Sequence, residues 1–211
     1  MKTLTLLTCI ALGFATLNAA QAAPKEKAGR SENFTQEVIN QVNRVRTNPQ
    51  AYAAYLERFR PYYTADGLFR APGRRTLRTQ EGITALEQAI RTLQHANPQA
   101  PITASDLLAG AGRELINAQQ QTGQIGHGGA PFDRMMHYGV WQDMAGENVA
   151  YGAPTAESVV YNLVVDDGER SRGHLKNILQ PGFRVAGVSN GHHPIYGSIC
   201  VIDFASDFGR P

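Results

Sequence analysis

The sequence predicts an α+β fold, a layered domain built around an antiparallel sheet. Apolar residues recur at helical spacing through the first half of the chain, and runs typical of strands come only near its end. The chain also lacks the repeated alternation of strand and helix that builds a parallel sheet. Helices that come first and strands that come late therefore favour an α+β arrangement over a βαβ series.

Residues 1–22 are predicted to be a secretory signal peptide. Lys2 is the only charged residue before Lys25, the segment 4–17 is mostly apolar, and small residues occupy the cleavage positions at 20–22. Nothing later in the chain has the roughly 20 apolar residues that a membrane span needs. We therefore expect no transmembrane segment, and export to the periplasm or the medium.

After the signal we expect a flexible leader over residues 23–32, which is charged and contains glycine, and then a single domain over residues 33–211. The first helix is predicted over 33–46, where four apolar residues share one face: Phe34, Val38, Val42 and Val45. Asn48 before Pro49 predicts the N-cap of a second helix.

Residues 58–79 are predicted to form an irregular insert that is rich in arginine. Four of its arginines could meet phosphates, glycans or anionic lipids, namely Arg70, Arg74, Arg75 and Arg78. A solvated loop or packing arginines explain the cluster better, because no aromatic residues alternate with them. With 20 basic and 18 acidic residues overall, nucleic-acid binding is not expected.

Three further helices and two strands complete the prediction. The helices are placed near 83–93, from Ser105 to about Gly123, and from Thr155 to about 165, with a short helical stretch at 132–138. The strands are placed at 184–189 and 195–204, with Asn190-Gly191 as a hairpin signal and His192 and His193 exposed in the turn. Cys200 lies in the second strand and is expected to be a buried, inert thiol.

Three short segments carry the residues that are candidates for a functional site. His127 lies in a Gly-His-Gly-Gly loop, Glu147 lies between a glycine and an apolar run, and His174 follows another glycine. Two imidazoles and a carboxylate can bind a divalent metal or move protons. We therefore expect His127, Glu147 and His174 to converge on one solvent-accessible hollow.

With these motifs the chain resembles the superfamily of cysteine-rich secretory proteins, antigen 5 and plant pathogenesis-related proteins (the CAP or SCP domain), in its bacterial branch. The resemblance is carried by the segment 42–49, by His127, by the Gly-Glu-Asn-Val-Ala segment at 146–150, and by the segment 173–179. It implies a three-layer α-β-α sandwich with a central antiparallel sheet. The many disulfides of the animal and plant members are absent, and the insert at 58–79 lies outside the common pattern.

The resemblance also implies a central cleft where two histidines and two acids meet. The tetrad would be His127, Glu147, His174 and an acid at the end of the helix before His174, where Asp166 falls on the glutamate of the family pattern. Glu169 and Asp167 are the fallback acids. Because Asp is one methylene shorter than Glu, we expect Asp166 to reach the cleft through water.

His127 and His174 are predicted to bind a divalent metal weakly, most plausibly zinc, since two histidines alone make an open site. Glu147 could supply a third ligand or act as the base for a metal-bound water. It could instead orient the nearby loops by accepting backbone N–H bonds.

Two functions follow from this site. The first is an extracellular module that binds a lipid, a glycan or a protein, in interaction with a host or the cell envelope. The second is a metal-dependent peptidase or esterase with Glu147 as its catalytic base. Binding is preferred, because no third histidine ligand and no HExxH or Gly-x-Ser-x-Gly motif is present.

Overall fold

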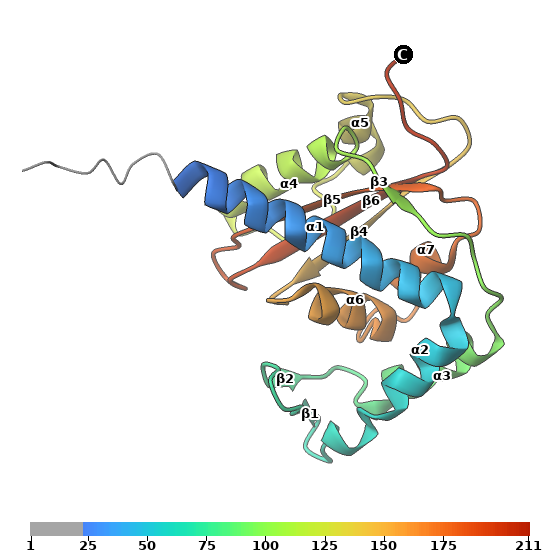
Figure 1. The fold of residues 1–211 in the computed structure, drawn as a ribbon. Helices are drawn as coiled ribbons and strands as arrows, with labels where there is room; N and C mark the ends of the chain where they lie inside the picture. The colour runs from blue at the N-terminus through green and yellow to red at the C-terminus, as the bar shows by residue number, and fades with distance from the viewer. Residues whose placement is uncertain (1–22) are drawn as a thin grey trace, which may run out of the picture.

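The computed structural model describes residues 23–211, and side chains from residue 33 onward. Helices dominate the first half of the chain and two long strands end it, as predicted (Figure 1). The helices are α1 (Ala23–Thr47), α2 (Pro49–Glu57), α3 (Ile83–His95), α4 (Ala109–Thr122), α5 (Pro131–Met136), α6 (Ala156–Val165) and α7 (Gly173–Leu179), with a 3-10 turn η2 (Arg60–Tyr62). The strands are β1 (Leu68–Phe69), β2 (Leu77–Arg78), β3 (Thr103–Ala104), β4 (Ala145–Tyr151), β5 (Val185–Gly191) and β6 (Ile199–Ala205).

The main sheet has the order β3-β5-β6-β4 and is antiparallel, except that the two-residue strand β3 pairs in parallel with β5. Helix α4 packs on one face of β5 and β6, whereas α1, α6 and α7 pack on the other face (Figure 1). The fold is therefore the three-layer α-β-α sandwich that was predicted, with a central sheet that is antiparallel along its three long strands.

The two faces of the sheet build separate parts of the core. The alternation of side chains along β6 directs Ile202 and Phe204 into the large cluster beneath α1 and α6, and Val201 into a smaller cluster beneath α4. The backbone of α4 can approach the sheet because residue 187 is glycine. A Cβ at Gly187 would lie 2.2 Å from the backbone nitrogen of Ala109.

Several boundaries differ from the prediction. Helix α1 begins at Ala23, so it includes the segment 23–32 that was expected as a leader. Asn190-Gly191 does not turn the chain: both residues pair with β6, and the turn comes after Gly191. Strand β4 was not predicted, and neither was helix α7. The predicted signal peptide at 1–22 lies outside the described residues.

The insert at 58–79 contains a small hairpin, β1 and β2, at one end of the molecule (Figure 1). Phe69 of this hairpin stacks on Tyr161 of α6, with ring centroids 5.4 Å apart. Arg74 lies over the same Tyr161 ring and forms an ion pair of 3.0 Å with Glu157. Arg74 is thus a packing arginine, and the insert is tied to the sandwich through α6.

None of the helices within residues 23–211 combines the length and the apolar character that crossing a bilayer requires.

Candidate functional site

A cleft of about 640 Å³ brings together segments that are far apart in the sequence. Its walls come from the loop after α4, from β4, from the end of α6 with the turn that follows, and from the insert. His127 and His174 both line this cleft. The structure therefore places the two predicted imidazoles at one solvent-accessible hollow.

His127 projects from a loop whose backbone depends on glycine. Gly126 and Gly128 on either side have φ values of 91° and 67°, in the left-handed region that glycine adopts without steric cost. The ring donates from Nδ1 to Oε1 of Glu147 at 2.7 Å. The His127 side chain is 49% exposed and that of Glu147 only 1%, so a buried carboxylate orients an accessible ring.

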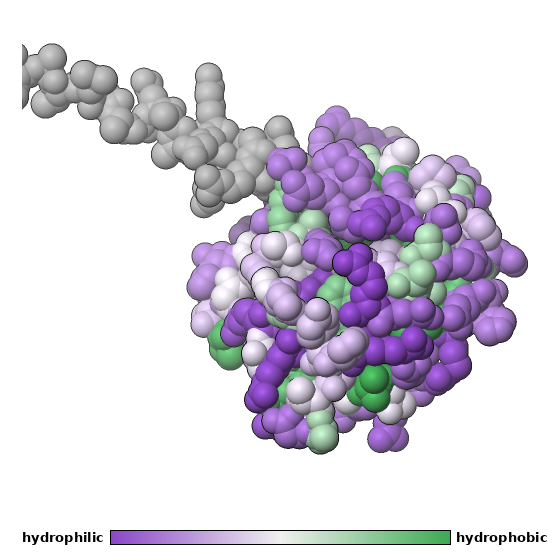
Figure 2. Space-filling model, turned by 60° about the horizontal axis from the view of Figure 1, so that its bottom comes forward, coloured by the Kyte–Doolittle hydropathy of each residue, from purple (hydrophilic) through white to green (hydrophobic). Residues whose placement is uncertain are grey.

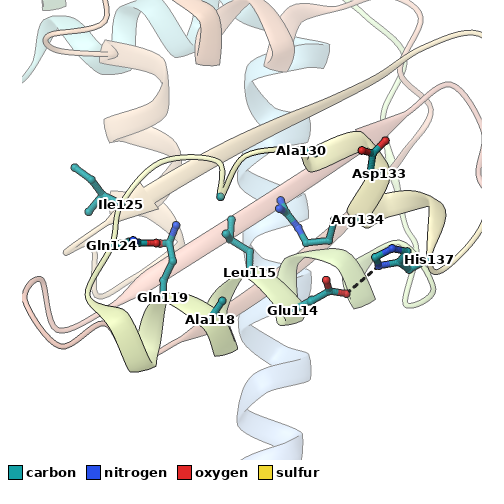
Figure 3. A pocket seen from close by; sticks show the side chains of 11 residues that line it. Glu114, Leu115, Ala118, Gln119, Gln124, Ile125, Ala130, Asp133, Arg134 and His137 are labelled. Carbon is teal, nitrogen blue, oxygen red and sulfur yellow. Dashed lines mark hydrogen bonds and ion pairs between the residues drawn. The ribbon is translucent and has the colours of Figure 1, made fainter.

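Glu147 is held from a second side by an arginine that was not predicted. Arg134 of α5 donates from Nη2 to Oε2 of Glu147, and from Nη1 to the backbone oxygen of His127 at 3.0 Å. Figure 3 shows Arg134 extending from α5 toward Leu115 of α4, where it borders a second pocket of about 310 Å³. Both oxygens of Glu147 are thus engaged within the protein.

A second buried acid, Asp203, lies beside Glu147. It faces Glu147 across the β4–β6 pair, and it has no solvent exposure. Burial, reinforced by the charge of Glu147, raises the pKa of Asp203 well above its usual value. The pKa of His127 is also raised, chiefly by its hydrogen bond to Glu147, while desolvation opposes this effect.

His174 has its own buried carboxylate, that of Asp166. The ring donates from Nδ1 to Oδ1 of Asp166 at 2.5 Å, and the His174 backbone N–H donates to Oδ2 at 3.0 Å. Asp166 ends α6 with a left-handed φ of 56°, which directs its side chain toward the start of α7. The contact is therefore direct, and the expectation that Asp166 would reach the cleft only through water is wrong.

Two asparagines connect the two histidine–acid pairs. Asn148, next to Glu147 in β4, donates to the backbone oxygen of His174 at 3.0 Å. Asn177 of α7 donates to the side-chain oxygen of Asn148 at 2.8 Å and to the backbone oxygen of Glu147 at 3.3 Å. The position of His174 is thereby fixed relative to the strand that carries Glu147.

The fallback acids line the cleft but contact neither imidazole. Asp167 accepts the backbone N–H groups of Gln80 and Glu81 at 2.7 and 2.8 Å, and so holds the end of the insert. Glu169 accepts the backbone N–H of Ser171 at 3.0 Å. Their roles in this structure are to fix the loop after α6 and the segment it contacts.

The expectation that His193 is exposed is wrong. Its side chain is fully buried, its Nδ1 accepts the backbone N–H groups of Ile195 and Tyr196 at 3.3 Å each, and its Nε2 donates to the backbone oxygen of Gln124 at 3.0 Å. It connects the β5–β6 turn to the loop after α4, whereas His192 is exposed as predicted.

His127 and His174 are the imidazoles in the lining of the cleft, and so the residues there that could hold a metal through nitrogen. Within the described residues, no group of three or more His, Cys, Asp or Glu side chains is arranged to hold an ion. In both His127 and His174, however, Nδ1 is held by a carboxylate, which leaves Nε2 as the nitrogen able to bind a metal. Carboxylates that hold the second ring nitrogen are usual behind histidine metal ligands.

The residues that sequence reasoning missed are Arg134 and Asp203. Arg134 follows the histidine loop by one helical turn of α5, and its sequence context resembles that of any helix-surface arginine. Asp203 lies within the apolar run of β6, and an acid in such a run is itself a signal, because burying a carboxyl group requires a compensating environment.

No family model matches the chain. The uncharacterized protein YkwD of Bacillus subtilis (strain 168) is 31% identical over 121 residues, which cover 54% of this chain and 45% of that protein. The chain therefore spans less than half the length of this relative.

Two solved structures are similar at low sequence identity. An extracellular protein from Bacillus anthracis str. Ames, described as containing an SCP domain, has a TM-score of 0.41 and 19% identity, over 56% of this chain and 39% of that one. An outer surface protein from Borrelia burgdorferi has a TM-score of 0.43 and 20% identity, over 61% of this chain and 91% of that one.

Proposed function

We propose that this chain is an exported bacterial protein of the CAP/SCP superfamily that binds an extracellular ligand in the cleft, with a divalent metal held by His127 and His174. One observation carries the proposal. Two histidines from distant segments line the same cleft, and the Nδ1 of each is held by a separate buried carboxylate, Glu147 or Asp166.

The proposed roles of these side chains follow from which of their atoms are free. The Nε2 atoms of His127 and His174 would hold the metal, and Glu147 and Asp166 would fix the orientations of the two rings. Two nitrogen ligands leave the other coordination positions of a zinc ion to water and to oxygen atoms of a ligand. When bound, the ion would supply a Lewis acid that attracts such oxygens.

A metal-dependent hydrolase is the weaker proposal. A general base must reach the water whose proton it removes. Glu147 is 1% exposed, and its two oxygens are engaged by His127 and Arg134. These contacts favour an orienting role for Glu147, so binding without catalysis is the function we put forward.

Zinc titration of the purified protein tests the metal site. We expect H127A/H174A to lose zinc binding in calorimetric titration, whereas H137A/H192A, which removes two exposed histidines outside the cleft, should bind as the unaltered protein does. Equal zinc affinity in H127A/H174A and in the control variant would overturn the ligand assignment.

The variant E147Q separates the two roles of the acid. If Glu147 orients His127, zinc affinity should fall by roughly 10- to 100-fold, as is typical when such a supporting group is lost. If Glu147 is a base, zinc affinity should be unchanged and hydrolysis of peptide, ester or cell-wall substrates should disappear. That second pattern would favour the hydrolase over the binding module.

A further inference from the structure

We infer that the insert gives the cleft a cationic wall, formed by Arg75 and Arg78, that selects ligands bearing a phosphate or carboxylate group and an apolar portion. This inference rests on the proposed function in one respect, that the cleft is the ligand-binding site. It does not require the metal.

The insert contributes directly to the wall of the cleft that contains His127 and His174. Arg75, Leu77 and Arg78 line the same space as the two histidines. Arg75 lies just before β2 and Arg78 lies within it, so the hairpin places both arginines along the wall of the cleft. The two arginines are exposed, and a ligand in the cleft can reach them.

The segment that carries these arginines is anchored at its far end. Glu81 forms an ion pair of 2.6 Å with Arg172, which has little exposure, and also accepts the backbone N–H of Gly168 at 2.8 Å. Asp167 accepts the two successive N–H groups of Gln80 and Glu81. With Phe69 stacked on Tyr161, the hairpin is held against the cleft by contacts on both of its sides.

The four arginines between residues 70 and 78 divide into two groups. Arg70 pairs with Asp66 at 3.5 Å and Arg74 pairs with Glu157 at 3.0 Å, so both are neutralised locally. Among residues 33–211, neither Arg75 nor Arg78 has a carboxylate within 4.0 Å. Arg75 donates from Nη1 to the backbone oxygen of Tyr196 at 3.3 Å, which leaves its other donors available.

Each acid that lines the cleft forms a hydrogen bond within the protein. Asp166 binds His174, Asp167 binds the backbone of the insert, and Glu169 accepts the Ser171 N–H. Arg75 and Arg78 are the arginines in the lining of the cleft, and neither is paired with these acids, so both can donate to an anionic ligand. Guanidinium groups match the geometry of phosphate and carboxylate oxygens and donate paired hydrogen bonds to them.

Part of the remaining wall is apolar and accessible. Tyr196 is 41% exposed and Ile125 is 60% exposed, and both line the cleft. Figure 2, which turns the hairpin end of the molecule toward the viewer, shows strongly hydrophilic side chains next to scattered hydrophobic ones rather than one broad apolar face. A mixed surface of this kind suits a ligand in which an anionic group is joined to an aromatic ring or a short apolar chain.

The test uses metal-free protein, kept in chelator, and three small probes. Phenyl phosphate and phenylacetate carry the two candidate anionic groups, and phenylacetamide is the neutral counterpart. We expect calorimetric titration to show that at least one anion binds, that phenylacetamide does not, and that the affinity falls as salt is raised. The anion that binds more tightly identifies the preferred group.

Two double variants remove the same charge from different places. R75Q/R78Q should weaken anion binding by roughly tenfold, the loss expected for two exposed charged contacts. R58Q/R70Q, whose arginines do not line the cleft, should bind as the unaltered protein does. Equal losses in both variants, or equal binding of phenylacetamide and the anions, would overturn the inference. Because metal is absent throughout, failure of the metal site would not alter this result.

Discussion

Each imidazole of the cleft depends on a buried carboxylate, and each carboxylate depends in turn on further contacts. Glu147 is held by Arg134, and Asp166 is held by the N–H of His174 itself. Asp203 differs, because the group that faces it across the β4–β6 pair is another carboxyl group, that of Glu147.

The buried carboxyl of Asp203 predicts a pH dependence of stability. Because its folded-state pKa is raised, the folded protein keeps a proton that the unfolded chain releases above about pH 3.9. Stability should therefore fall as pH rises from about 4 toward the folded pKa. We expect D203N to flatten this part of the curve, and to be at least as stable as the unaltered protein at neutral pH.

Urea unfolding at a series of pH values measures this effect. D106N provides the control, because it makes the same chemical change at an exposed carboxyl. A curve for D203N that keeps the slope of the unaltered protein would show that Asp203 is ionised in the folded state.

Residue identities at the site were predictable only in part. His127, Glu147 and His174 stood out because each lies beside glycine, and Asp166 was found through the resemblance. The pairing of Glu147 with Asp203 depends on the register of β4 against β6, which local sequence does not reveal. The burial of Arg46 could not be predicted from local sequence either. Its guanidinium group is fully buried and donates four hydrogen bonds, to the backbone oxygens of Ala100, Ile178, Gln180 and Phe183.

At the scale of elements, helices were predicted better than strands because their signals are local. The side chain of Asn48 accepts the N–H of Ala51 at 3.1 Å, as its place before Pro49 indicates, and Gly123 ends α4 in the left-handed conformation. Strand β4 was missed because it lies between layers on both faces, so its sequence lacks the polar–apolar alternation of a half-exposed strand.

Helix α6 has a capping box that predicts a measurable contribution to stability. Thr155 Oγ1 accepts the Ser158 N–H at 3.2 Å, and Ser158 Oγ accepts the Thr155 N–H at 3.0 Å. T155A should lower the free energy of unfolding by about 1 kcal/mol, whereas T155S should keep most of it, because the hydroxyl is retained. Chemical denaturation measures both; an equal loss in the two variants would mean that the threonine methyl, and not the cap, stabilises the helix.

For the whole molecule, stability comes from packing rather than from covalent links. Cys200 is free and fully enclosed in β6, so the described chain folds around its core without a disulfide. The order of helices and strands predicted an α+β domain with an antiparallel sheet, and the resemblance supplied the three layers. The placement of the insert beside the cleft was not predicted, because it depends on contacts between Asp167 and the backbone of residues 80 and 81.

The enclosed thiol predicts a reporter of global unfolding. Burial raises the pKa of Cys200 to about 12, so the reactive thiolate is scarce as well as inaccessible. In a C9S variant, whose single thiol is Cys200, we expect Ellman's reagent to react only as the protein unfolds, and the melting temperature to be unaffected by reductant. Complete labelling of the native protein within minutes would contradict this.

Asp166 meets two demands that few residue types meet together. Its backbone turns with a positive φ, which suits glycine, asparagine or aspartate, and its side chain must present a carboxylate to His174. Glycine offers no carboxylate, asparagine no negative charge, and glutamate little tolerance of the turn. The chain has aspartate where the family pattern that it resembles has glutamate, and the shorter acid suits the positive φ of this loop. We expect the identity of this acid and the conformation of the loop to have changed together during evolution.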